Sequence, residues 1–88
     1  MSGVVRDRVR ELHRREAEAG RGQHFVSAFR EIVARLQREP LEFGEPRYRL
    51  PVLRLLVRQG GIHRVVVSYA VHEVHPLVFI RGIAVLSS

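Results

Sequence analysis

Cysteine, lysine and tryptophan are absent from this sequence of 88 residues. A chain without cysteine forms no disulfide, no thiolate metal site and no cysteine nucleophile, and a cytoplasmic location is the expectation. No apolar run approaches the roughly 20 residues that a membrane span needs. The chain also does not open with a basic segment followed by an apolar stretch, as a secretory signal does. We therefore expect a single cytoplasmic domain, residues 1–88, with no membrane partner.

Positive charge is abundant and comes from one residue type. Fifteen basic residues stand against nine acidic ones, giving a net charge of +6, and all fifteen are arginine. A GC-rich genome would account for the preference of arginine over lysine. Whatever the origin of this preference, the planar guanidinium group suits phosphate and carboxylate. The expected partner is therefore a polyanion or an acidic protein. Residues 47–88 concentrate this charge, with six arginines and one acid, Glu73.

The first half of the chain predicts a helical hairpin over residues 4–38. Two helices are expected, at 4–19 and at about 23–38, separated by Gly20 and Gly22. Apolar side chains recur there at helical spacing; they are Val5, Val9 and Leu12, then Phe25, Phe29, Ile32, Val33 and Leu36. Pro40 ends the second helix because proline has no N–H to donate within it.

The second half predicts an antiparallel sheet over residues 47–86. β-branched residues at alternate positions indicate three strands, at 47–58, 62–73 and about 77–86. Gln59–Gly61 and His75-Pro76 are the expected loops between them. The predicted fold class is thus α+β, with the helical hairpin packed on a three-stranded antiparallel β-meander.

These loop positions give the sheet one apolar face and one arginine-rich face, with Tyr69 opposite Gly82. The apolar face is expected to pack on the second helix; it consists of Leu53, Leu55, Val57, Val65, Val67, Tyr69, Val71, Val78, Ile80, Ala84 and Leu86. The other face carries the candidate residues for binding nucleic acid or a partner, namely Arg54, Arg58, Arg64, His72, Phe79 and Arg81. A solvated face, a nucleic-acid groove and a protein-binding groove all remain open.

No metal, cofactor or catalytic motif stands out. In His72-Glu73-Val74-His75 the second histidine comes one position too early for the HExxH zinc motif. On a strand these two histidines point to opposite faces unless the turn brings them together, and a surface turn without a metal is expected. The sequence has no glycine-rich phosphate loop, nucleophile elbow or triad spacing, and no cofactor is predicted.

Several segments, taken in order, resemble the RelE/ParE superfamily of toxins from bacterial toxin–antitoxin modules. The segments are Phe25–Leu36, the run Leu41-Glu42-Phe43-Gly44-Glu45-Pro46, Arg54-Leu55, and Val66-Val67-Ser68-Tyr69-Ala70-Val71. The resemblance covers roughly residues 8–86. It implies a helical hairpin on a small antiparallel sheet, an antitoxin that wraps the basic face, and a target that is either ribosome-bound messenger RNA or DNA gyrase.

The sequence departs from this family at three points. The ribonuclease branch uses residues after the last strand, and the sequence has no histidine, tyrosine or arginine there. Family members usually open with a strand, whereas this chain starts almost at the first helix. The ribonuclease branch places its catalytic arginine three residues before the strand tyrosine, and here Val66 stands at that position. Without the first strand a sheet edge is left open, which favours a homodimer or a partner strand at that edge.

Three functions follow as hypotheses. The first is a toxin-like protein that acts by binding an acidic protein or a nucleic acid through the arginine-rich face. The second is a ribosome-dependent messenger-RNA endonuclease, in which Arg54, Arg64 and Arg81 stabilise phosphate charge in the transition state. The third is a non-toxic adaptor that dimerises through its sheet edge.

Overall fold

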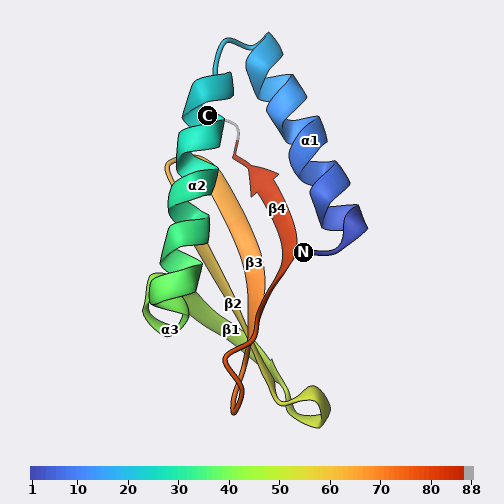
Figure 1. Cartoon of the computed structure of the whole chain (residues 1–88), viewed down its shortest axis with the longest axis vertical. Coiled ribbons are helices and arrows are strands. Elements are labelled where there is room, and N and C mark those ends of the chain that lie inside the picture. The colour runs from blue at the N-terminus through green and yellow to red at the C-terminus, as the bar shows by residue number, and fades with distance from the viewer. Residues whose placement is uncertain (87–88) are drawn as a thin grey trace.

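The computed structural model describes residues 1–86 and shows an α+β fold in which two helices precede a four-stranded antiparallel sheet (Figure 1). The elements are α1 (Gly3–Glu18), α2 (Gly22–Arg38), α3 (Pro40–Phe43), β1 (Glu45–Leu50), the 3₁₀ turn η1 (Pro51–Leu53), β2 (Leu55–Ile62), β3 (Val65–His72) and β4 (Val78–Val85). The strand order is β1-β2-β3-β4. Among these elements, no helix combines the length and the apolar character that crossing a membrane requires.

The predicted helical hairpin is confirmed. Ser2 caps α1, because its Oγ accepts a hydrogen bond from the Val5 N–H at 3.3 Å. Gly20 has a φ of +80°, a left-handed conformation that suits glycine and turns the chain between the helices. A Cβ at Gly22 would lie 3.2 Å from Cα and Cβ of Ala17. Glycine at this position therefore lets α2 begin in close contact with α1.

Both long helices pack on one face of the sheet. Leu12 of α1 and Ile32 of α2 share a buried cluster with alternate residues of β3, and Ile32 and Tyr69 are fully buried. The cluster consists of Leu12, Phe25, Ala28, Ile32, Leu36, Val65, Val67, Tyr69, Val71 and Ile83. Burial of these apolar side chains, at about 25 cal/mol per Å² removed from water, is the main force that holds the two layers together.

The sheet has four strands, so the predicted number of three is wrong. The segment 47–58, predicted as a single strand, contains most of β1, the turn η1 and the first part of β2. Pro51 opens η1, and Arg54 closes it with a left-handed φ of +54°. The chain reverses at this turn, and Leu50 pairs with Leu55. The apolar pattern changes phase at Val52 and Leu53 because these residues form this turn.

The predicted loop at Gln59–Gly61 is also wrong, because both of its glycines lie inside β2. A Cβ at Gly60 would lie 2.7 Å from Cε2 of Phe43, and a Cβ at Gly61 would lie 2.9 Å from the Val65 carbonyl oxygen. Gly60 thus lets Phe43 of α3 pack against β2, and Gly61 lets β3 approach closely. The turn lies three residues later, between Ile62 and Val65.

This new turn position changes which face each β2 side chain occupies. Arg58 pairs with Tyr69, and the register differs from the predicted one by an odd number of residues. An odd shift moves every side chain of a strand to the opposite face. Leu55 and Val57, predicted to pack on the helices, therefore point away from them, and Leu53 lies in η1 with 59% of its surface exposed.

The pairing of β3 with β4 differs from the prediction as well. Tyr69 lies opposite Ile80, and Ser68 lies opposite Gly82. A bulge at Arg81 shifts the register between these two pairs. Beyond the bulge Ile83 faces the helices in place of the predicted Ala84, and Leu86 is exposed.

The other side of the sheet carries no described helix, and we call it the open face. It is defined by five residues, Tyr48, Val57, Ala70, Phe79 and Arg81.

Candidate nucleic-acid interface

One row of paired residues crosses the open face through all four strands. Tyr48 pairs with Val57, Val57 with Ala70, and Ala70 with Phe79. The outer members are aromatic and exposed, at 52% for Tyr48 and 45% for Phe79, whereas Val57 and Ala70 between them are almost completely buried. A small inner pair is thus flanked by two exposed rings.

Arg81 and Tyr48 explain this burial. Nη1 of Arg81 donates a hydrogen bond to the Tyr48 hydroxyl at 2.9 Å. The two residues belong to β4 and β1, the outermost strands, which lie about 14 Å apart at the usual strand spacing. The two long side chains must therefore extend toward each other across the middle of the sheet. We infer that they cover Val57 and Ala70, which no described helix covers.

The bulge in β4 places Arg81 for this contact. Ile80 and Gly82 pair with successive residues of β3, which leaves Arg81 as the extra residue between them. A bulge of this kind changes the direction of a side chain without ending the strand. Only Nη1 of Arg81 has a hydrogen-bond partner among the described residues, so most of its donors remain available to an anion.

Two more predicted residues, Arg54 and His72, lie where η1 meets the β3–β4 connection. Arg54 is exposed at the end of η1, and its carbonyl accepts a hydrogen bond from the Glu73 N–H at 2.9 Å. His72 ends β3, and its Nδ1 accepts hydrogen bonds from the N–H groups of Val74 and His75, both at 3.1 Å. His72 therefore organises the β3–β4 connection rather than the open face.

Arg58 and Arg64 do not join the predicted surface. Arg58 lies on the face that packs on the helices and is only 8% exposed. Its Nη2 donates to the Gly44 carbonyl, while its Nε has no hydrogen-bond partner within residues 1–86. Arg64 lies in the β2–β3 turn at the far end of β2 from Arg54, and its Nε donates to the Leu86 carbonyl at 2.7 Å. The shifted register accounts for Arg58, and the shifted turn for Arg64.

A polar cluster around Tyr69 escaped prediction from the sequence. The Tyr69 hydroxyl donates to the Pro40 carbonyl at 2.7 Å and accepts from the Gly44 N–H at 3.0 Å. A Cβ at Gly44 would lie 2.7 Å from this hydroxyl and 2.6 Å from the Gln59 carbonyl oxygen. Tyr69 thus joins β3 to the segment that follows α2. A tyrosine among valines in a core strand was the available signal, because a buried hydroxyl requires a partner.

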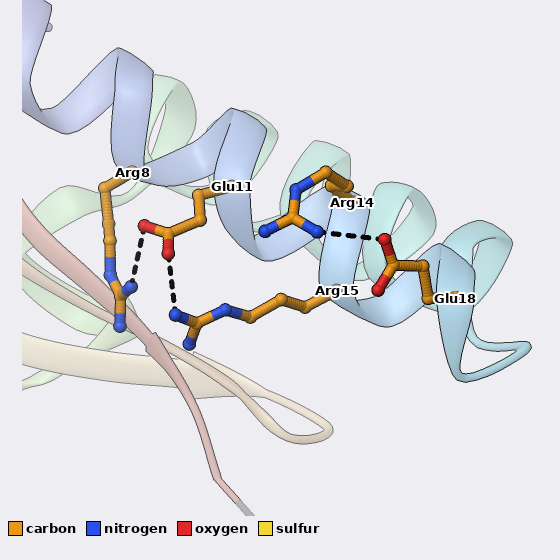
Figure 2. A network of polar contacts seen from close by, with 5 residues as sticks. All are labelled: Arg8, Glu11, Arg14, Arg15 and Glu18. Atoms are coloured by element: carbon orange, nitrogen blue, oxygen red, sulfur yellow. Dashed lines mark hydrogen bonds and ion pairs between the residues drawn. The ribbon is translucent and has the colours of Figure 1, made fainter.

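Most charges on the helices are already paired with each other. On α1, Glu11 bonds to Arg15 at 2.6 Å and to Arg8 at 3.2 Å, and Arg14 bonds to Glu18 at 2.9 Å (Figure 2). The charge of Arg15, followed by the hydrogen bond from Arg8, lowers the pKa of Glu11. Such exposed pairs at helical spacing stabilise a helix by a few tenths of a kcal/mol. Among the arginines of α1, Arg6 alone forms no ion pair within residues 1–86.

One ion pair connects the two helices. Nε and Nη2 of Arg21 donate to the two carboxylate oxygens of Glu16, at 3.1 and 3.2 Å. The hydrogen bonds from Arg21 lower the pKa of Glu16, as does the nearby charge of Arg64, and the same hydrogen bonds raise the pKa of Arg21. Residues 1–86 hold no group of three or more His, Cys, Asp or Glu side chains arranged for a metal ion.

No family model, curated protein or solved structure matches this chain.

Proposed function

We propose that this chain is a toxin-like protein that binds single-stranded RNA on the open face of its sheet. The observation that supports this is the row in which Tyr48 and Phe79, both about half exposed, flank a central strip reached by Arg81. Bases stack on exposed aromatic rings, and guanidinium groups bind the phosphates between them. An acidic protein would use Arg81 but would gain little from two separate rings, so RNA is favoured.

The resemblance to the RelE/ParE toxins enters as part of this proposal. Two of the residues in the segments that carry the resemblance, Gly44 and Tyr69, meet in one hydrogen-bonded cluster, which also includes the Pro40 carbonyl. Gly44 and Tyr69 lie 25 residues apart in the sequence. Their contact gives a structural reason why both residues occur among the segments of the resemblance. The order of helical hairpin and antiparallel sheet also agrees with the resemblance.

Binding is favoured over RNA cleavage. The endonuclease hypothesis needs Arg54, Arg64 and Arg81 around one phosphate. Arg54 and Arg64 lie beyond opposite ends of the eight-residue strand β2, which corresponds to about 26 Å. Groups that stabilise a transition state must lie within hydrogen-bond distance of the same atoms. These three arginines therefore do not form one catalytic site.

A binding titration tests the proposal. A labelled single-stranded RNA is titrated with the protein and with Phe79→Ala, and anisotropy is recorded. Loss of one stacked base costs about 1–3 kcal/mol, so the affinity should fall between about 5-fold and 150-fold. Leu77→Ala is the matched control, because Leu77 is also 45% exposed but lies outside the strands. Equal affinity of the two variants would contradict the proposal.

Expression in a bacterial host tests the toxin part separately. Induction of the protein should arrest growth, and Phe79→Ala combined with Arg81→Ala should relieve the arrest. Uncut transcripts in arrested cells agree with binding, and transcripts cleaved at defined sites would support the endonuclease instead. Normal growth on induction would favour the adaptor hypothesis.

A further inference from the structure

A small pocket lies where the junction of α1 and α2 meets the β2–β3 turn, on the helix side of the sheet. Its volume is about 200 Å³. Phe25 and Ala28 of α2 and Val65 of β3 line it, and all three belong to the buried cluster, at most 3% exposed. The pocket therefore reaches the core, and its inner surface is apolar.

Basic side chains from two separate segments also line this pocket. Arg21 and His24 lie where α2 begins, and His63 and Arg64 form the β2–β3 turn. The two histidines are exposed and the two arginines are half-buried. These groups thus lie between the apolar inner surface and the solvent. Glu16 of α1 lines the pocket as well.

Ion pairing leaves one guanidinium group of this pocket without a counter-charge. Arg21 binds both carboxylate oxygens of Glu16, at 3.1 and 3.2 Å, so this pair is neutral as a whole. Arg64 forms no ion pair within residues 1–86. Its charge is close enough to contribute to the lowered pKa of Glu16. The pocket therefore carries one positive charge that a ligand could balance.

The backbone of the turn holds Arg64 beside the pocket. Nε of Arg64 donates to the Leu86 carbonyl at 2.7 Å, and the Leu86 N–H donates to the Arg64 carbonyl at 2.8 Å. This reciprocal contact joins the turn to the end of β4 and leaves the two terminal nitrogens of Arg64 without a hydrogen-bond partner among the described residues. A group fixed in this way loses little conformational entropy when a ligand binds.

We propose that this pocket binds a small carboxylic acid with an apolar body, of the size of a single-ring aromatic acid. The apolar body occupies the space beside Phe25, Ala28 and Val65. The carboxylate accepts two hydrogen bonds from the terminal nitrogens of Arg64, a geometry that suits a guanidinium group. The open face lies on the other side of the sheet, so the proposal is independent of RNA binding.

Size and charge select this class of ligand. Pockets for drug-sized molecules have volumes of roughly 300–1,000 Å³, so a pocket of about 200 Å³ takes a smaller one. One unpaired guanidinium group balances the single charge of a carboxylate, whereas a phosphate monoester carries about −1.5 to −2. An apolar inner surface also favours a ligand with an apolar body over a bare inorganic anion.

A titration followed by NMR of the ¹⁵N-labelled protein tests the pocket. The probes are benzoate, its uncharged analogue benzamide, acetate, which lacks the ring, and inorganic phosphate, all at constant ionic strength. Benzoate should shift the resonances of residues 24–28 and 63–65 to saturation and bind at least about tenfold more tightly than the other three. Equal binding of benzoate and any of these, or no saturable shift at millimolar benzoate, would overturn the proposal.

Substitutions of Arg64 test the charge. Arg64→Gln should weaken benzoate binding about tenfold or more, and Arg64→Lys, which keeps the charge, should weaken it less. Arg38→Gln is the matched control, because Arg38 is exposed on α2 and does not line the pocket. Equal losses in the two Arg64 variants would mean that Arg64 only holds the turn, and the proposal would be wrong.

Filling the pocket tests its apolar part. Ala28→Val and Val85→Phe each reduce the space from a different element, so one variant remains informative if the other does not fold. Each should weaken benzoate binding at least about fivefold, and the NMR spectrum shows whether the variant is folded. Ala34→Val, on α2 outside the pocket, should leave binding unchanged. Full affinity in a folded Ala28→Val or Val85→Phe variant would contradict the proposal.

Discussion

At Tyr69 a single hydroxyl group connects the sheet to the segment that leaves α2. The ring is fully buried, and the hydroxyl bonds to both Pro40 and Gly44. Arg58 reaches the Gly44 carbonyl from the neighbouring strand. Polar groups in such a buried cluster depend on each other for their hydrogen bonds, so we expect loss of one member to be costly.

Tyr69→Phe should lower the free energy of unfolding by about 1–3 kcal/mol, because it leaves the Gly44 N–H and the Pro40 carbonyl without this partner. Tyr48→Phe is the matched control. It removes an exposed hydroxyl bonded to Arg81 and should cost less than about 0.5 kcal/mol. Urea denaturation of both variants measures the difference, and equal losses would contradict a structural role for the Tyr69 hydroxyl.

At the scale of the elements, the sheet edges differ in character. β1 carries Pro46, Arg47 and Arg49 and a register shift, all features that oppose pairing with another strand. β4 is also an edge strand, and Arg81 is its only charged residue. The homodimer predicted through a sheet edge stays a prediction, and β4 is the edge that suits it better.

The junction of α1 and α2 should depend on pH through Glu16. Its pKa lies below the ordinary value of 4.5 in the folded protein, mainly because Arg21 donates hydrogen bonds to its carboxylate. We assign the ordinary pKa of 4.5 to Glu16 in the unfolded chain, so the pair with Arg21 stabilises the fold fully above pH 4.5. This stabilisation is lost as the pH falls through the lower pKa of Glu16 in the folded protein. The Glu16→Gln variant should be less stable than the wild type at pH 7, and the difference should vanish in acid.

Urea titrations between pH 7 and pH 3 measure this difference. Glu31→Gln provides the control, because Glu31 is exposed and forms no ion pair within the described residues. A difference between wild type and Glu16→Gln that stays constant over this range would show that the pair with Arg21 does not stabilise the fold.

For the whole molecule, the net charge of +6 predicts that RNA binding weakens with salt. On single strands the logarithm of the affinity changes with the logarithm of the salt concentration by about −0.7 for each phosphate contacted. Arg81→Ala should therefore reduce the slope by about 0.7, whereas Phe79→Ala should lower affinity at every salt concentration without changing the slope. Arg14→Ala, which removes a partner of Glu18 (Figure 2), should leave the slope unchanged. An unchanged slope in Arg81→Ala would place the RNA elsewhere.

The sequence by itself determined the two long helices, their apolar sides and the antiparallel character of the second half, because each depends on a periodicity within about 16 residues. The site was predictable only in part. Phe79 and Arg81 do lie on the open face, but Tyr48 was not among the predicted residues, and Arg58 lies on the opposite side.

Only the tertiary structure decided which side chains share a face of the sheet. The glycines at 60 and 61 suggested a turn, but they lie within β2 because Phe43 and the neighbouring strand approach too closely for a side chain. That contact joins segments far apart in the chain, and no local pattern encodes it. Successive side chains of a strand point to opposite faces. A change of the pairing register by an odd number of residues was therefore enough to move Arg58 from the expected surface into the core.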